Sequence, residues 1–285
     1  MSFQADYHIH HHVDPCADTE MTLPNIDEAA HAMGLQEIAV LTHCSTQLPG
    51  GKEDWGWWHK LRKDRFAVYL SEVRSFSSEY GTQIYSGIET ELVDDSGRIA
   101  ATDDLLHKVD MAALSLHYLP DIAVFPWLPD DFPPIGHGVD FQKQYQKWQR
   151  AISDIPPAFI LEALAEAHIK AIQKNPKIRT LAHLDDMSYT PGLYGIRFEA
   201  MNESLFTEIL EPLMRAVAEH EVLWEITEAC PLRPMFRRAK ELGVRFTPTS
   251  DAHFISDGWG PLSRRRGAVE KLESMGLAAS PVVIR

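Results

Sequence analysis

The stretch DYHIHHHVDPC, residues 6–16, holds four of the 14 histidines of this chain. Ile9 interrupts these histidines, and Asp6 and Tyr7 precede them, so the stretch does not look like an expression tag, which is usually a pure histidine run. In a β-strand, residues i and i+2 point to the same face, so a strand over 5–10 places the His8 and His10 rings side by side at its end. Two such rings are half of a metal site, and the rest of the chain has to supply the other half.

Outward from this stretch, short apolar runs alternate with longer amphipathic segments. The runs predict strands over 5–10, 37–43, 83–89, 111–117, 178–183, 222–227 and 245–251. Helical patterns lie between them, for example over 24–34, 203–220 and 233–243, with Gly34 as a stop signal. This alternation predicts a parallel sheet. Seven strands in 285 residues favour an α/β fold, a single distorted TIM-like (β/α)7 barrel, with 1–285 as one domain.

Two inserts interrupt this pattern, at about 44–58 and 118–140. Both are rich in Pro, Gly and aromatic residues, which predicts loops. Both begin at the C-terminal end of a predicted strand, the end at which α/β barrels hold their sites. The first insert has a tryptophan-rich group that forms either a lid over a ring-bearing substrate or a hydrophobic plug for the loop. This group consists of Trp55, Trp57, Trp58 and His59.

Composition narrows the class of protein. The net charge is −14, and the densest basic cluster, RRR at 264–266, predicts only a solvated helix start, so we expect no nucleic-acid partner. The three cysteines, Cys16, Cys44 and Cys230, argue against a disulfide framework and favour a reducing cytoplasm. We find no signal peptide and no run of about 18 apolar residues, so we expect no membrane partner. The sequence leaves the oligomeric state open.

The residues at the predicted strand ends are candidate metal ligands. Metal-binding residue types stand at the ends of six of the seven predicted strands: His8, His10, His43, Glu89, His117, His183, Asp251 and His253. Parallel strands of a barrel all end at one rim, so these side chains should converge. A lone buried histidine is more often structural than a ligand, but the coincidence across strands reverses that expectation. Imidazoles with carboxylates favour Zn, Mn or Fe over Ca or Mg. Eight ligands suffice for two or three divalent ions, a common device for hydrolysing phosphoesters and some amides.

Several short motifs together resemble a known family. They are DYHIH (6–10), TH (42–43), GIE (87–89), SLH (115–117), AH (182–183) and SDAH (250–253). In this order they resemble the PHP family, the polymerase-and-histidinol-phosphatase metal-dependent phosphoesterases. Each motif alone is weak, but together they cover almost the whole chain.

The resemblance implies a distorted (β/α)7 barrel with a trinuclear Zn, Mn or Fe site in which the eight residues above are the ligands. It implies that Glu89 bridges two metals and that a metal-activated hydroxide attacks the phosphorus of a small anionic phosphorylated metabolite. Histidinol phosphate is the natural specific candidate. As catalytic residues we expect Glu89, with Asp251 or His253 assisting proton transfer.

Substrate binding is expected from side chains around the same rim. A guanidinium there would clamp a phosphate through two hydrogen bonds, whereas the alternative is an arginine in solvent. The candidates are Arg233, Arg197 and His117.

The chain departs from the family pattern in two places. The second motif is usually Thr-Asp-His and reads Leu41-Thr42-His43 here, which should affect the support of a ligand rather than remove one. Cys16 stands where many relatives have a further histidine, with His12, Asp14 and Asp18 nearby. Cys16 is therefore either a thiolate ligand or a small packed residue, and the occupancy of a third metal site stays open.

Other polar residues have simpler expected roles. Glu91 should support the residues around Glu89, and Asp185 and Asp186 either hold His183 or cap the turn that follows it. His11 and His12 are ambiguous because a turn is expected there. Histidines in helical patterns should be ordinary surface or core residues: His31, His107, His168 and His220.

Two other functions remain open at this stage. One is an amidohydrolase-like metal hydrolase of a C–N or C–O bond, which the lack of an obvious carboxylated-lysine strand end disfavours. The other is a non-catalytic PHP accessory module, which the retention of nearly all ligand positions disfavours.

Overall fold

The computed structural model describes residues 3–44, 63–117, 119–123, 152–183, 196–230, 235–256, 258 and 260–284. Several predictions lie outside these residues. They concern the tryptophan-rich group, most of both inserts, Asp185, Asp186 and Arg233.

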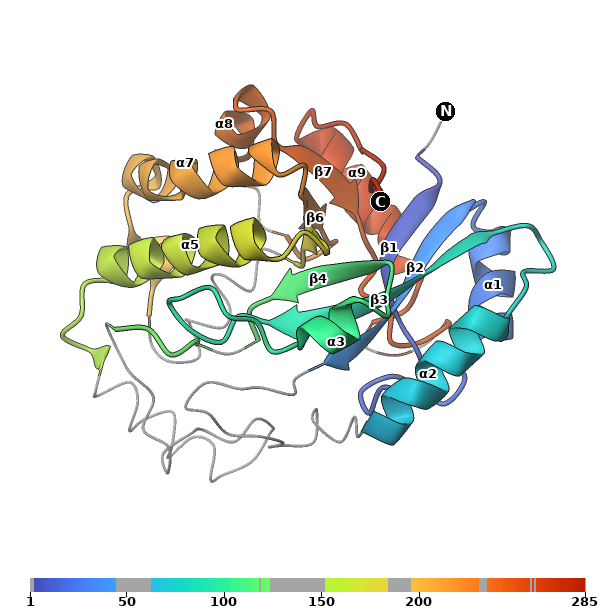
Figure 1. Ribbon diagram of the computed structural model, residues 1–285. Coiled ribbons are helices and arrows are strands. Elements are labelled where there is room, and N and C mark those ends of the chain that lie inside the picture. The colour runs from blue at the N-terminus through green and yellow to red at the C-terminus, as the bar shows by residue number, and fades with distance from the viewer. Residues whose placement is uncertain are drawn as a thin grey trace.

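Seven strands alternate with helices along the chain (Figure 1). The strands are β1 (Ala5–His10), β2 (Glu37–Cys44), β3 (Gln83–Glu91), β4 (Met111–Ser115), β5 (Ile178–Leu181), β6 (Leu223–Ile226) and β7 (Arg245–Pro248). The helices are α1 (Leu23–Ala32), α2 (Lys63–Ser75), α3 (Asp103–Leu106), α5 (Pro157–Lys174), η3 (Phe198–Ala200), α7 (Glu203–Glu219), α8 (Met235–Glu241) and α9 (Arg264–Ser274). All seven strand predictions are confirmed to within three residues at each end.

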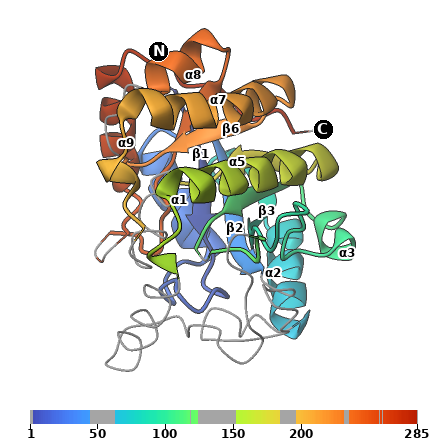
Figure 2. The same ribbon diagram turned by 90° about the vertical axis from the view of Figure 1, so that its left-hand side faces the viewer.

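The strands form one parallel sheet in the order β1-β2-β3-β4-β5-β6-β7. The sheet curls until its two edges meet: the His10 amide donates to the Ala252 carbonyl at 2.8 Å, and the Ala252 amide donates to the His8 carbonyl at 3.3 Å. The helices lie outside the curl, with α5 and α7 packed side by side (Figure 2). The result is the predicted distorted (β/α)7 barrel, whose strand C-termini share one rim.

Local sequence signals set the limits of the helices. Pro24 lies in the first turn of α1, and Gly34, with φ +73°, lies just beyond its end. At the start of α7 the Asn202 side chain accepts hydrogen bonds from the amides of Ser204 and Leu205. These signals fix where α1 ends and where α7 begins, and thereby limit the connections to the neighbouring strands.

Two hydrophobic clusters pack against the two faces of the sheet. The larger one joins the sheet to the helices, and the smaller one, with Tyr7, Leu41 and Leu223, consists almost entirely of strand residues inside the curl. The pairing of β1 with β2 shifts register between Asp6 and Ile9. Tyr7 therefore belongs to the inner cluster and Ile9 to the outer one, although strict alternation would put them on one face. The register shift thus places the Tyr7 side chain in the hydrophobic cluster inside the barrel.

The prediction of a solvated helix start at 264–266 is wrong for the middle arginine. Arg265 is 6% exposed, because the helical period turns it toward β1. Its Nε donates to the Ala5 carbonyl at 2.7 Å, and its Nη2 donates to the Phe3 carbonyl at 2.5 Å. Burial raises the pKa of the nearby Asp6 carboxyl to about 6, against the opposing effect of the Arg265 charge. Arg265 thus fastens the N-terminal strand to α9.

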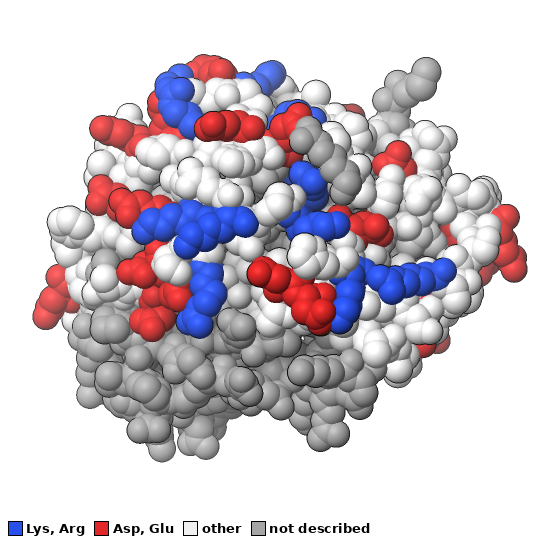
Figure 3. Space-filling model, viewed as in Figure 1, with Lys and Arg blue, Asp and Glu red and all other residues white. Residues whose placement is uncertain are grey.

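On the face shown in Figure 3, lysine and arginine side chains lie interspersed with aspartate and glutamate. Charges of both signs therefore alternate over this face. Ion pairs among the described residues include Arg98 with Asp94, at 2.9 Å, and Arg238 with Glu211, at 2.8 Å. Among the described helices, none combines the length and the hydrophobicity that crossing a bilayer demands.

Candidate metal centre

The side chain of Glu89, at the C-terminal end of β3, lies at the centre of the rim. Its Oε2 atom lies 2.9 Å from His43 Nε2 and 3.3 Å from the Nε2 atoms of both His8 and His10. The Nε2 atoms of His8 and His10 are 3.2 Å apart. Residues from the first three strands therefore meet at one carboxylate oxygen.

The remaining predicted ligands complete the ring around Glu89. Its other oxygen, Oε1, lies 2.9 Å from His183 Nε2 and 3.5 Å from His117 Nε2. The Asp251 Oδ1 atom lies 3.3 Å from His10 Nε2, and the ring of His253 stacks on that of His10 with 4.0 Å between centroids. The structure thus brings together all eight residues that the sequence analysis placed at this rim.

Burial differs across this cluster. The side chains of His8, His10 and Glu89 have no exposed surface, whereas those of His117 and Asp251 are 18% and 21% exposed. Within the described residues, His117 and Asp251 therefore form a more accessible side of the cluster.

Asp251 is also held in an unusual backbone conformation. Its φ is +51°, in the left-handed region that residues other than glycine, asparagine and aspartate seldom occupy. Such strain persists only where the surroundings enforce it, and it is common at functional sites. Here it accompanies an Oδ1 atom placed against the His8 and His10 nitrogens, at 3.6 and 3.3 Å.

In four of these histidines, the ring nitrogen that faces away from Glu89 contacts a carboxylate of another residue. The Nδ1 contacts are His8 with Glu225 at 2.8 Å, His10 and His43 with Asp14 at 3.1 and 2.8 Å, and His117 with Glu91 at 2.5 Å. An ionised carboxylate only accepts hydrogen bonds, so in a neutral ring Nδ1 carries the proton and Nε2 keeps its lone pair. Four lone pairs then point toward Glu89, which is the usual arrangement of histidines that bind metals.

The pKa values of the cluster residues indicate how its charges are balanced in the absence of a cation. Burial lowers the pKa of His8, but Glu225 and Glu89 outweigh it, so the pKa lies well above its usual range. Burial likewise raises the pKa of Glu89, but the rings of His43, His8 and His117 hold it well below its usual range. Protons therefore compensate the charges of the cluster, and a bound cation would take their place.

The donor set fits a divalent transition-metal ion. Glu89 Oε2 is fully buried and has no well-aligned hydrogen bond from any described residue, although three Nε2 atoms lie within 3.3 Å of it. Zn–N and Zn–O bonds are about 2.0–2.2 Å, so tetrahedral ligand atoms lie about 3.3–3.6 Å from one another. Of the sets of described residues whose ligand atoms lie within 4.8 Å of one another, three consist only of the predicted ligands. They are His8, His10 and Asp251; His8, Glu89 and His183; and His43, Glu89 and His117.

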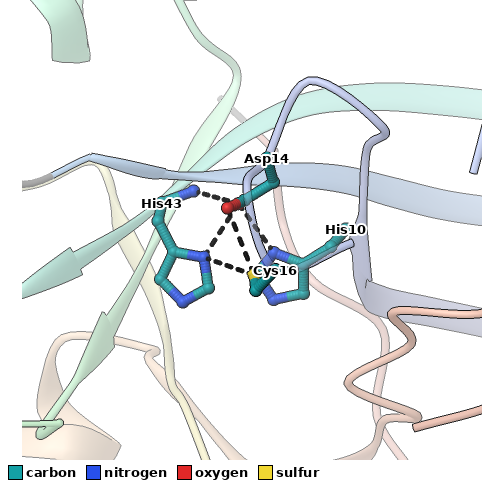
Figure 4. Close-up of side chains that lie close together, drawn as sticks. All are labelled: His10, Asp14, Cys16 and His43. Carbon is teal, nitrogen blue, oxygen red and sulfur yellow. Dashed lines mark hydrogen bonds and ion pairs between the residues drawn. The ribbon is translucent and has the colours of Figure 1, made fainter. Parts of the chain in front are cut away.

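Asp14 and Glu225 are contacts that the sequence analysis did not assign. Asp14 Oδ2 accepts from His43 on one side and His10 on the other (Figure 4). Glu225 is the contribution of β6, the one strand with no predicted ligand at its end. A signal for it was available, because a charged residue inside the apolar run LWEI needs a partner.

Cys16 lies on the side of His43 that faces away from Glu89. Its Sγ atom is 3.2 Å from Asp14 Oδ1 and 3.6 Å from His43 Nδ1 (Figure 4). Burial and the Asp14 charge raise the pKa of the Cys16 thiol to about 11. In the metal-free protein the thiol is therefore protonated and donates to Asp14. The Sγ atom also lies within 4.8 Å of ligand atoms of His10, Asp14 and His43, a set that could hold a cation, so the geometry accommodates both interpretations of Cys16.

Other predicted residues fall around this centre or away from it. Arg197 directly precedes η3 with an exposed side chain. Glu91 has the expected supporting position, and it acts on His117 through both the ring Nδ1 and the backbone amide, at 2.5 and 2.9 Å. Of the helical histidines, His168 is buried and donates to the Leu164 carbonyl, and His31 stacks on Tyr80.

Two hollows of the described surface lie elsewhere. One, of about 510 Å³, is lined by residues at the starts of β5 and β6, such as Lys177 and Val222. The other, of about 930 Å³, lies between α2 and α3. Neither hollow includes a member of the histidine–carboxylate cluster.

Comparisons with known proteins agree with this geometry. No protein-family profile matches the chain. A probable phosphatase of Thermoanaerobacter sp. (strain X514) is 22% identical over 275 residues, which cover 96% of this chain and 88% of that protein.

Two solved structures resemble the whole barrel. One is the histidinol phosphate phosphatase of Lactococcus lactis in complex with Zn, L-histidinol and phosphate, with a TM-score of 0.55, 18% identity and coverage of 99% of this chain and 97% of that one. The other is a candidate histidinol phosphatase of Listeria monocytogenes, with a TM-score of 0.61, 16% identity and coverage of 88% and 95%. The fold is therefore that of the histidinol phosphatases, as the motifs predicted.

Proposed function

We propose that this protein is a metal-dependent phosphoesterase that releases phosphate from a small phosphomonoester, with L-histidinol phosphate as the first candidate substrate. The observation that carries the proposal is the set of imidazole Nε2 atoms gathered on the buried Glu89, with carboxylates behind four of the rings. The probable phosphatases similar in sequence and the histidinol phosphatases similar in fold support it.

In this proposal the rim residues hold two or three divalent ions, of which zinc is the best supported because the Lactococcus lactis structure contains it. The ligands would be His8, His10, His43, Glu89, His117, His183, Asp251 and His253. Such ions lower the pKa of a bound water and neutralise charge on phosphoryl oxygens. In a protein of net charge −14, they would also supply the local positive charge that an anionic substrate needs.

We assign the other roles in this reaction, which are orienting the ligands, transferring a proton and binding the substrate, to further residues of the chain. Asp14, Glu91 and Glu225 fix the tautomers of the ligand histidines, so that their lone pairs point inward without reorganisation. Asp251, one-fifth exposed at the open side of the cluster, is placed to exchange a proton with a bound substrate. Arg197, whose side chain is exposed, and Arg233 are the proposed contacts of the phosphate or its leaving group, and we propose that the whole chain acts as one domain.

The experiment is phosphate release from a panel of phosphorylated metabolites, L-histidinol phosphate included, by protein loaded with zinc or manganese and by the same protein with a chelator. We expect chelator-sensitive release from at least one compound. The Glu89→Gln variant should lose that release, whereas Glu79→Gln, a glutamate outside the cluster, should keep it. No release by protein shown to carry its metals would overturn the proposal and favour hydrolysis of a non-phosphate bond or an accessory role.

A further inference from the structure

A second cluster of histidines and a carboxylate lies on the outer side of the barrel wall. His11 follows His10 directly, but its ring packs edge-on against Tyr69 of α2, with 5.6 Å between centroids. The Tyr69 hydroxyl is bound to the carbonyls of Val40 and Gly87 at 2.6 and 2.9 Å, which fixes this helix to the outside of the sheet. The cluster of His11, His12 and Glu72 therefore shares no residue with the centre around Glu89.

Three potential ligand atoms converge in this outer cluster. Glu72 Oε2 lies 3.2 Å from His11 Nε2 and 3.0 Å from His12 Nε2, and the three atoms fall within 4.8 Å of one another. The His11 side chain is fully buried, and its Nε2 atom has no well-aligned hydrogen bond from any described residue, the nearby Glu72 included. The buried His11 nitrogen thus points at a carboxylate and at a second imidazole without a well-aligned hydrogen bond to either. A cation bound between the three groups would explain this arrangement.

From this geometry we propose that His11, His12 and Glu72 form a second, separate site for a divalent cation of the zinc type. Two imidazoles and one carboxylate suit Zn²⁺ better than Mg²⁺ or Ca²⁺. Three protein ligands leave a fourth position for water. His12 and Glu72 are 30% and 38% exposed, so the ion would exchange with the solvent.

A cation at this site would strengthen the link between two parts of the fold that already meet at the Glu72 carboxylate. His11 and His12 begin the segment that carries Asp14 to His10 and His43, and Glu72 belongs to α2. The outer ion would therefore anchor that segment to the helix and raise the stability of the folded state. It need not touch the substrate, so the inference stands whether or not the proposed phosphatase activity is right.

The competing arrangement is free of metal. In it both imidazoles share the Glu72 carboxylate, and the Val13 amide donates to His11 Nδ1 at 3.4 Å, which requires the proton on Nε2. Binding a cation through Nε2 moves that proton to Nδ1 and gives up one long hydrogen bond. The two arrangements exclude each other, so counting bound ions separates them.

The experiment is a zinc titration of the full chain, followed by removal of free ion and determination of bound zinc by mass spectrometry. The variants are His12→Ala and Glu72→Ala, both at half-buried positions, with His31→Ala, a surface histidine stacked on Tyr80, as the control. We expect each of the two variants to bind one equivalent less than the wild type and the control, with phosphate release unchanged at saturating metal. Zinc should also raise the thermal unfolding midpoint of the wild type more than that of the variants.

A further variant, His8→Ala, keeps the outcomes distinguishable. It should lose zinc from the centre around Glu89 and retain the outer equivalent, so failure of the central site does not erase the outer one. Equal zinc content in the wild type, His31→Ala, His12→Ala and Glu72→Ala would overturn the inference and support the metal-free arrangement.

Discussion

One carboxylate oxygen of Asp14 accepts two hydrogen bonds from His43, from the backbone amide at 2.7 Å and from the ring Nδ1 at 2.8 Å. The same oxygen lies 3.1 Å from the Nδ1 atom of His10. Asp14 therefore fixes the orientation of two proposed ligands and the position of the strand end that carries one of them. The Asp of the usual Thr-Asp-His motif is Thr42 here, and a carboxylate for this histidine comes instead from the segment after β1.

Removing the charge of Asp14 should weaken metal binding without unfolding the protein. We expect Asp14→Asn to lower the zinc affinity of the centre by about 10–100-fold, because the loss of such a supporting carboxylate typically has this effect. Zinc competition with a chromophoric chelator measures it. Asp18→Asn is the matched control, because the Asp18 carboxylate, in the same segment, accepts a hydrogen bond from the Glu20 amide and belongs to none of the sets of described residues that could hold a metal ion. Equal affinities of both variants and the wild type would contradict the role assigned to Asp14.

Zinc binding should depend steeply on pH. In the metal-free protein, carboxylates hold the pKa values of His8 and His43 well above their usual range, and that of His10 at about 10, although burial opposes this. Protons therefore compete with metal up to high pH, and the zinc affinity should rise as pH increases from about 6 to about 9. Calorimetry in two buffers of different ionisation enthalpy measures the protons released. Affinity independent of pH, with no proton release, would rule out this electrostatic account.

Arg265 should be important for stability although it lies outside the centre. Arg265→Met leaves the Asp6 carboxylate buried without a neighbouring positive charge, which we expect to cost about 3–5 kcal/mol in the free energy of unfolding at pH 8. The folded-state pKa of Asp6, about 6, lies above its ordinary value of 3.8, so burial destabilises the charged form and the protonated form escapes that penalty. The deficit of the variant should therefore shrink as pH falls from 8 to 5.

Urea unfolding at both pH values measures this difference, and Arg266→Met provides the control, because Arg266 is exposed one position further along α9. A deficit of the same size in Arg266→Met, or one that grows as pH falls, would be incompatible with the electrostatic effect of Arg265 on the buried Asp6 carboxylate.

The sequence was sufficient to predict the barrel and the eight residues of the rim, because both follow from local periodicity and from the rule that parallel strands end on one side. Glu89 and His183, for example, come from strands 94 positions apart along the chain, and they meet as the strand ends required. The reliable predictions were therefore those that needed only a strand and the residues at or just beyond its end.

The supporting contacts depend on the closed curl of the sheet, which periodicity does not give. Glu225 on β6 reaches His8 on β1 only because the sheet closes through Ala252, and the two residues are 217 positions apart. Arg265 showed only its charge in the sequence, whereas its buried position depends on how α9 packs against the first strand. Such pairings are set by tertiary packing and appear only in the structure.

The most direct test of the account is an anomalous difference map from crystals of the wild-type protein grown with zinc. We predict peaks beside Glu89, at about 2.0–2.2 Å from the Nε2 atoms of its surrounding histidines, with the Nδ1 contacts to Asp14, Glu91 and Glu225 preserved. Zinc-containing crystals without a peak at Glu89, or with the only nearby peak on the Nδ1 side between Asp14 and Cys16, would contradict the proposed centre.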